Sequence, residues 1–490
     1  MTSGTENTRI YTVFVSSGYG GAGAAPKSFT TNEDLVHALQ RECPGASFIV
    51  RDMTSSDISF EKVYSELESS KDNLDGVLII GSSRDYRLAF TGLPTIVVYN
   101  LFEWMLIPYK LYATGEEEHS VLVGGPDYKD GRILTAELDR RNVCSPSKRE
   151  AMFEDLVYKV GLIQALKKLK SSRILVVAPQ HYLAEVDYQG DRFKHLSQDY
   201  NERYTQALKD SLGVELVRVE PEAFYTAYEA TDGGEAESIA ETWMAGAEAV
   251  TAAKSEIVRT ARAYLAFEAL RERFDCNAVS THMRTLSDSG RTEDRFWPGL
   301  ALECGFKMRG IQAVCQNYPN ILVTQLLGYF LTGRPSMLGD IMIDRHNSVD
   351  ILTHCGAPIN PYGDERRVSY RIATHAESPV RDTQEPGSST GLHVEWPVGE
   401  PVTVWKAYVL NRKIGLHTGI TVDGHDLYKN LDEIMCRSKI VVRVENIEAV
   451  QNHQSPDAYG IHRAATLGDL RGTVKDVATL MGFDVMEEDV

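Results

Sequence analysis

The first third of the chain alternates short apolar runs with amphipathic stretches. Hydrophobic residues recur with helical spacing between most of these runs, over residues 33–41, 60–71 and 102–112. The runs themselves have the length and β-branched content of strands, and they cover residues 9–17, 47–51, 76–81, 95–99 and 120–124. Such alternation predicts a parallel sheet with helices on both faces.

The same alternation restarts after a long helical pattern over residues 152–170. A second set of strands is predicted at 173–179, 214–219, 278–281 and 311–315, followed by the strand that reaches Asp340. Helices are predicted at 235–274 and 320–331. We therefore expect a second parallel sheet in this part of the chain.

The pattern changes beyond His354, where alternating strands and polar loops dominate. Strands are predicted at 369–373, 391–396, 402–410, 414–422 and 438–444, and a closing helix at 470–481. The sequence thus predicts an α/β chain of three domains. Two doubly wound parallel-sheet domains, over 1–170 and 171–352, precede a β-rich C-terminal domain over 353–490.

Composition agrees with several domains and narrows the class of protein. At 490 residues the chain is longer than a single hydrophobic core usually supports. No apolar run reaches the roughly 18 residues of a membrane span, and the polar N-terminus lacks a secretory signal, so we expect a cytoplasmic protein with no membrane partner. A net charge of −18 argues against a nucleic-acid partner. The seven cysteines have no close spacing, which favours reduced thiols.

Candidate chemistry begins with two predicted strand ends. Cys315-Gln316 ends one strand, and Asp340 ends the apolar strand that follows after a single helix and a Leu-Thr-Gly-Arg-Pro turn. Open α/β sheets place ligands at the carboxyl ends of their strands, so parallel neighbours would bring residues 316 and 340 to one edge. An Asp at such a place is otherwise often only a helix or turn cap.

Together with His354-Cys355-Gly356 and the distant segment Gly460-Ile461-His462-Arg463, this pattern resembles the L-fucose isomerase family. The resemblance places Asp340 and His462 on the family's metal-binding Asp and His. Gln316 falls where the family has a Glu. The resemblance therefore implies a site in which Gln316, Asp340 and His462 hold Mn²⁺ or another divalent cation. It also implies a homotrimer or homohexamer. A lone loop His such as His462 would otherwise be only a solvated residue.

The resemblance also implies an aldose–ketose isomerase that acts on a pentose or deoxyhexose sugar through an enediol, with Asp340 and Gln316 as catalytic residues. A carboxamide can bind a hard cation, but it cannot accept a proton near neutral pH. Gln316 would therefore only coordinate or orient the substrate, while Asp340 or a metal-bound water serves as the base. Two alternatives stay open: a metal-dependent lyase or other carbohydrate enzyme that stabilises an ene-diolate without isomerising, and a non-catalytic sugar-binding homologue.

Several further residues are candidates on weaker grounds. Trp297 and His282 could bind substrate, since an indole offers a sugar ring an apolar face, although a buried core Trp is as reasonable. His354 is expected to be a structural partner in its strand. His417 and His425 flank a Gly/Asp turn, and two exposed hairpin histidines explain them better than a metal site.

The segment Gly18–Gly23 literally satisfies the glycine spacing of a dinucleotide-binding fingerprint. The fingerprint needs a helix to begin at once, whereas Pro26 and a polar stretch intervene here. A loop that covers a neighbouring subunit's active site, or a plain surface loop, is the better interpretation.

Overall fold

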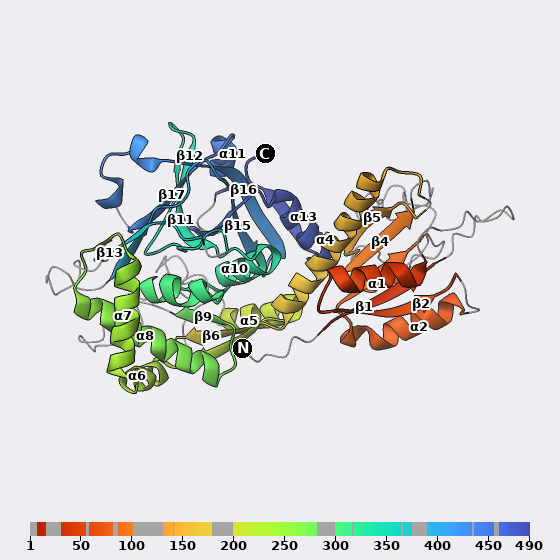
Figure 1. The fold of residues 1–490 in the computed structure, drawn as a ribbon, viewed down its shortest axis with the longest axis horizontal. Helices are drawn as coiled ribbons and strands as arrows, with labels where there is room; N and C mark the ends of the chain where they lie inside the picture. The colour runs from red at the N-terminus through yellow and green to blue at the C-terminus, as the bar shows by residue number, and fades with distance from the viewer. Residues whose placement is uncertain are drawn as a thin grey trace. The chain divides into compact units, whose positions relative to one another are not determined.

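The computed structural model describes residues 7–15, 31–54, 58–81, 87–100, 131–140, 142–178, 199–281, 299–315, 318–363, 366–374, 390–433, 436–454 and 460–490. The chain divides into two compact units (Figure 1). The first contains residues 1–168 and 474–484, and the second contains 169–473 and 485–490. Each unit is described by itself below.

The first unit is built on a five-stranded parallel sheet in the order β2-β1-β3-β4-β5. Its strands are β1 (Thr8–Phe14), β2 (Ala46–Asp52), β3 (Gly76–Ile80), β4 (Thr95–Asn100) and β5 (Ile133–Leu138), and its helices are α1 (Asn32–Glu42), α2 (Phe60–Ser70) and most of α4 (Pro146–Lys170). A cap formed by the Thr31 side chain, which accepts from the Asp34 backbone N–H, starts α1 where the pattern predicts. The predicted parallel α/β arrangement is confirmed.

The second unit begins with a four-stranded parallel sheet in the order β10-β9-β6-β7. Its strands are β6 (Arg173–Val177), β7 (Glu215–Val219), β9 (Ala278–Thr281) and β10 (Gln312–Val314), and the helices of this part are α5 (Tyr200–Leu212), α6 (Pro221–Glu229), α7 (Gly233–Gly246), α8 (Lys254–Arg273) and α10 (Pro319–Thr332). This sheet confirms the second run of parallel strands.

A seven-stranded sheet follows in the order β15-β18-β11-β12-β17-β16-β19. Its strands are β11 (Met337–Asp344), β12 (Val349–His354), β15 (Pro401–Tyr408), β16 (Lys413–Val422), β17 (Ser438–Arg443), β18 (His462–Leu467) and β19 (Asp484–Glu487). Since β15 also pairs with β16, the first six strands of this order close into an antiparallel ring. The β-rich C-terminal part is thus confirmed.

Smaller elements complete the described regions. In the second unit, strands β13 (Tyr370–Ala373), β14 (Gly391–Val394) and β8 (Ala249–Val250) form a short sheet, and α11 (Ile447–His453) follows β17. Helix α13 (Arg471–Met481) lies mostly in the first unit. The single helix predicted over 235–274 is wrong. It breaks after Gly246 because Glu248 and Thr251 donate backbone hydrogen bonds to β13, at 2.9 and 2.8 Å.

Helix α10 lies between the parallel sheet and the antiparallel ring (Figure 1), and contacts strands of both. It ends at Gly333, whose φ of +70° is the left-handed conformation that favours glycine, and whose N–H donates to Tyr329 O at 2.7 Å. Arg334 then donates to Leu467 O at 2.8 Å, which ties the turn to β18. The Leu-Thr-Gly-Arg-Pro segment therefore fixes the approach of β11 beside β18.

Among the helices in the described ranges, none is both long enough and apolar enough to cross a bilayer.

Candidate functional site

Asp340 and His462 form a close pair across two strands of the ring. They lie directly opposite each other in the antiparallel register of β11 and β18. Side chains at such positions project from the same face of the sheet. His462 Nε2 approaches Asp340 Oδ1 to 2.7 Å, and the two side chains are 5% and 20% exposed. Strand pairing alone thus brings together two residues that are distant in the sequence.

The electrostatics of this pair keep Asp340 ionised. Burial raises the pKa of its carboxyl, but the imidazoles of His462 and His354 outweigh burial, so the pKa lies below its usual range. The 2.7 Å between Nε2 and Oδ1 is a hydrogen-bond distance, and the bond from His462 contributes to the lowered pKa of Asp340. A carboxylate oxygen and an imidazole nitrogen are also atoms that can bind a divalent cation.

Tyr318 orients His462 from the other side. The two rings stack with their centroids 4.0 Å apart and their planes 33° apart, and Tyr318 is buried. Tyr318 directly precedes α10. The segment that links β10 to α10 therefore reaches the Asp340–His462 pair at its C-terminal end.

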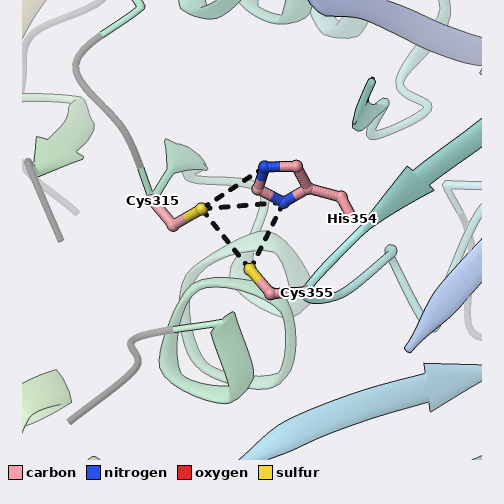
Figure 2. Close-up of side chains that lie close together, drawn as sticks. All are labelled: Cys315, His354 and Cys355. Carbon is pink, nitrogen blue, oxygen red and sulfur yellow. Dashed lines mark hydrogen bonds between the residues drawn. The ribbon is translucent and has the colours of Figure 1, made fainter. Parts of the chain in front are cut away.

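The other end of that segment meets a second cluster, formed by Cys315, His354 and Cys355 (Figure 2). Cys315 Sγ lies 3.6 Å from His354 Nδ1 and 3.4 Å from Cys355 Sγ, and Cys355 Sγ lies 3.3 Å from the same Nδ1. All three side chains are buried. The rings of His354 and His462 are 6.3 Å apart between centroids, so the two clusters are neighbours.

The charge state of this cluster is set by its surroundings. Burial lowers the pKa of the His354 imidazole, but the Cys355 sulfur and the carboxylates of Asp340 and Glu303 outweigh burial and raise it to about 9. Contact with Cys315, together with burial, raises the pKa of the Cys355 thiol well above its ordinary value.

A buried ion pair, Glu303–Lys307, lies next to the cluster. Lys307 Nζ donates to Glu303 Oε1 at 2.9 Å and to Ser336 O at 3.0 Å, and both charged side chains are buried. Glu303 lies against the turn after Cys355, because a Cβ added to Gly356 would stand 2.8 Å from Glu303 Cγ. Burial raises the pKa of the Glu303 carboxyl above its usual range. The pair adds no net charge when both members are ionised.

The structure brings Asp340 and His462 together, but by a different route from the predicted one. Strand β11 belongs to the antiparallel ring and β10 to the parallel sheet, so the expectation that they are parallel neighbours is wrong. Asp340 lies within its strand, and His462 begins β18 and does not sit in a loop. Gln316, Trp297 and His282 lie outside the described residues, as does the Gly18–Gly23 segment.

Sequence reasoning missed the Cys315–His354–Cys355 cluster. His354-Cys355 directly follows one apolar run, and Cys315 ends another. The sequence therefore shows that these three possible metal ligands lie at the ends of predicted strands. Nothing in their spacing indicates that the ends of a parallel and an antiparallel sheet meet. His354 was expected to be only a structural partner in its strand.

The prediction of an exposed His417 is also wrong. His417 is fully buried, between Glu488 Oε2 at 2.8 Å and Asp350 Oδ2 at 3.1 Å, and Arg463 lies 3.5 Å from Glu488. Strands β12 and β16 are separated by β17 in the sheet, so this contact spans the inside of the ring. His425, by contrast, is about half exposed, as expected.

Comparisons with known proteins give little further information. The chain matches no protein-family model, and no curated protein matches it. Among solved structures, it is similar to an ABC transporter solute-binding protein from Bacillus halodurans C-125 with bound myo-inositol, with 14% sequence identity over 68% of this chain and 92% of that chain, and a TM-score of 0.15. A likeness at that TM-score carries no argument about function.

Proposed function

We propose that the chain is a metal-dependent aldose–ketose isomerase that acts on a pentose or deoxyhexose through an enediol. The observation that carries this proposal is the buried Asp340–His462 pair, whose oxygen and nitrogen lie 2.7 Å apart across β11 and β18. These are the two positions at which the resemblance to L-fucose isomerases implies metal ligands. Asp340 and His462 are far apart in the sequence, and the resemblance requires them to meet in the folded chain, so their contact supports the proposal.

The donor set fits a hard divalent cation such as Mn²⁺. Asp340 offers an ionised carboxylate, and His462 offers an imidazole nitrogen 2.7 Å from it. The resemblance implies that Gln316 would add an amide oxygen. The described residues on either side of it in the sequence are both near the pair: Cys315 contacts His354, and Tyr318 stacks on His462. When bound, the cation would polarise the carbonyl and hydroxyl groups of the sugar.

The chain's own residues would then move and direct the proton. Asp340, held ionised, accepts the proton that leaves one carbon and returns it to the next, and Gln316 orients the substrate without accepting a proton. Tyr318 keeps the His462 ring in place. His354 lies next to this pair, with its ring centroid 6.3 Å from that of His462.

Gln316 also favours a second candidate. A site with one fewer proton acceptor suits an enzyme that stabilises an ene-diolate and ends in elimination or cleavage. A sugar-binding protein without activity is a third outcome. The proposal further includes a homotrimer or homohexamer in the cytoplasm, with Trp297 and His282 at the substrate.

Solvent exchange separates these candidates. The protein is incubated in D₂O with a panel of pentoses and deoxyhexoses, with and without Mn²⁺, and the products are followed by NMR. An isomerase incorporates deuterium next to the carbonyl and interconverts aldose and ketose. A lyase releases a fragment, and a binder does neither. Failure to exchange any sugar in the panel would overturn the enzymatic proposal.

Variants of one strand make the test specific to the site. Asp340→Asn removes the base and should lower exchange by about 10²- to 10⁴-fold. Asp344→Asn is the matched control, because Asp344 lies on the same strand but bonds to Asn347 and Tyr428 near the surface. An equal loss in both variants would mean that the strand, and not the carboxylate of Asp340, matters.

Restoring the family's carboxylate with Gln316→Glu tests the tuning of the site. A strong rise in isomerisation would indicate that the native chain is adapted to a different reaction, which favours the lyase. Little change or a fall in isomerisation would support the isomerase.

A further inference from the structure

The Cys315–His354–Cys355 cluster has the geometry of a metal site that is separate from the Asp340–His462 pair. Its three side chains come from the end of β10 and the end of β12 and point toward one another (Figure 2). One ligand atom from each residue lies within 4.8 Å of the others. His354 Nδ1 lies 3.3 Å from Cys355 Sγ, and Cys315 Sγ lies almost equally far from both ring nitrogens, at 3.6 Å from Nδ1 and 3.7 Å from Nε2.

The distances match those that a tetrahedral cation requires. Zinc binds sulfur at about 2.3 Å and imidazole nitrogen at about 2.0–2.1 Å, so neighbouring ligand atoms in a tetrahedron are separated by about 3.8 Å for two sulfurs and about 3.5 Å for sulfur and nitrogen. The cluster shows 3.4 Å between the sulfurs, and 3.3 and 3.6 Å from Nδ1 to Cys355 and Cys315. The two sulfurs, and Nδ1 and Cys355 Sγ, would need to move slightly apart to reach the distances between ligand atoms in a zinc tetrahedron.

The charges are also suited to a buried dication. Two thiolates and a neutral imidazole cancel the charge of a divalent cation, so the occupied site would add none to a region where Glu303 and Lys307 already pair opposite charges. A purely packed core needs only the apolar character of buried thiols. It does not require two thiols and a histidine ring in mutual contact.

We propose that Cys315, His354 and Cys355 bind a thiophilic divalent cation of the Zn²⁺ class. Soft thiolates select such ions, whereas the carboxylate and imidazole of the neighbouring pair suit Mn²⁺ or Mg²⁺. The chain would then hold two different cations in neighbouring sites, since the rings of His354 and His462 are 6.3 Å apart. Three protein ligands leave a fourth position, as in zinc sites that keep one ligand exchangeable.

Cobalt is the probe, because a Co²⁺–thiolate bond gives a charge-transfer absorption that oxygen and nitrogen ligands do not. The full-length protein is treated with a chelator under reducing conditions, titrated with Co²⁺, and then challenged with Zn²⁺ and Mn²⁺. We expect about one equivalent of the thiolate band, with loss of the band on adding Zn²⁺ but not Mn²⁺. A folded protein without this band would overturn the proposal.

Three cysteine variants locate the site. Cys315→Ser and Cys355→Ser should each weaken Co²⁺ binding more than about 100-fold, because removal of a direct ligand costs at least as much as removal of an outer contact. Cys276→Ser is the control, since Cys276 is buried in the same unit and its thiol donates to Phe274 O at 3.6 Å, with no part in the cluster. Circular dichroism verifies that each variant is folded. A band that persists in both ligand variants would refute the site.

Two further measurements separate this proposal from others. A Cys315–Cys355 disulfide, found by mass spectrometry in protein purified without added oxidant, would assign the thiols to redox chemistry and overturn the metal site. Asp340→Asn should retain the cobalt–thiolate band even when sugar exchange is lost. The thiolate site and the proposed isomerase can therefore fail independently.

Discussion

Replacement of His417 by Leu tests the buried charges inside the antiparallel ring. The imidazole is fully buried between the carboxylates of Asp350 and Glu488, at 3.1 and 2.8 Å. Leucine fills a similar volume but can neither donate a hydrogen bond nor carry charge. The substitution leaves two buried carboxylates, of which Glu488 still has Arg463 at 3.5 Å and His453 nearby to offset its charge.

The expected loss follows from the electrostatics of His417. Burial lowers the pKa of the imidazole, but hydrogen bonds to Asp350 and Glu488 outweigh burial and raise it from 6.5 to about 9. At about 1.4 kcal/mol for each pH unit, that rise corresponds to about 3 kcal/mol of folding free energy. Breaking a buried ion pair by removing one partner typically costs about 3–5 kcal/mol, which agrees.

The sign of the pH dependence makes the test sharp. A group whose pKa is raised on folding contributes its full stabilisation below the pKa of the unfolded chain, near 6.5, and loses it as the pH rises through about 9. The wild type should therefore exceed His417→Leu by about 3 kcal/mol at pH 6, and the gap should narrow by pH 10. Urea unfolding followed by tryptophan fluorescence at both pH values measures it.

The control is His425→Leu, because His425 is about half exposed and faces Asp432 at 3.4 Å. Exposed pairs of this kind contribute at most about 1 kcal/mol. A gap for His417→Leu that is equally large at pH 6 and pH 10, or a loss no larger than that of the control, would refute the account of the buried network.

Two other variants probe the supports of the site. Gly339→Ala places a Cβ 2.7 Å from Leu352 Cβ, which should force β12 away from β11. We expect this variant to be less stable by about 1–3 kcal/mol in urea unfolding and to show slower sugar exchange. In the control Gly472→Ala the added Cβ meets open space, so neither quantity should fall. Tyr318→Leu removes the ring that stacks on His462. Calorimetry should show Mn²⁺ binding about 10- to 100-fold weaker in this variant once circular dichroism has verified that it is folded. Unchanged affinity would mean that the stacking does not orient the ligand.

Much of the fold could be predicted because local patterns determine it. Apart from β5, the strands of both parallel sheets were predicted as apolar runs between helical patterns, and α10 ends at Thr332, next to its predicted end at residue 331. The helix predicted over 102–112 and the strand predicted over 120–124 lie outside the described residues. Strand β18 was missed because its Ala464-Ala465 core gives almost no hydrophobic alternation. Its burial depends on neighbours that the local sequence does not contain.

The same reason explains the errors about the site. An apolar strand such as β11 carries no signal for parallel or antiparallel pairing, so the predicted parallel edge with β10 was wrong although Asp340 and His462 do meet. Alternation predicted an outward His417, but four successive residues of β16, from Ile414 to His417, are buried. Its partners Asp350 and Glu488 are 67 and 71 residues away in the sequence.

Direct Mn²⁺ binding tests the central claim most sharply, because it does not depend on finding the right sugar. The chelator-treated protein is titrated with Mn²⁺ and the free ion is followed by electron paramagnetic resonance, for the wild type, Asp340→Asn, His462→Gln and the control Asp344→Asn. The account predicts one site whose affinity falls more than about 100-fold in Asp340→Asn and His462→Gln and is unchanged in the control. Equal affinity in all four proteins, or no binding by the wild type, would contradict it.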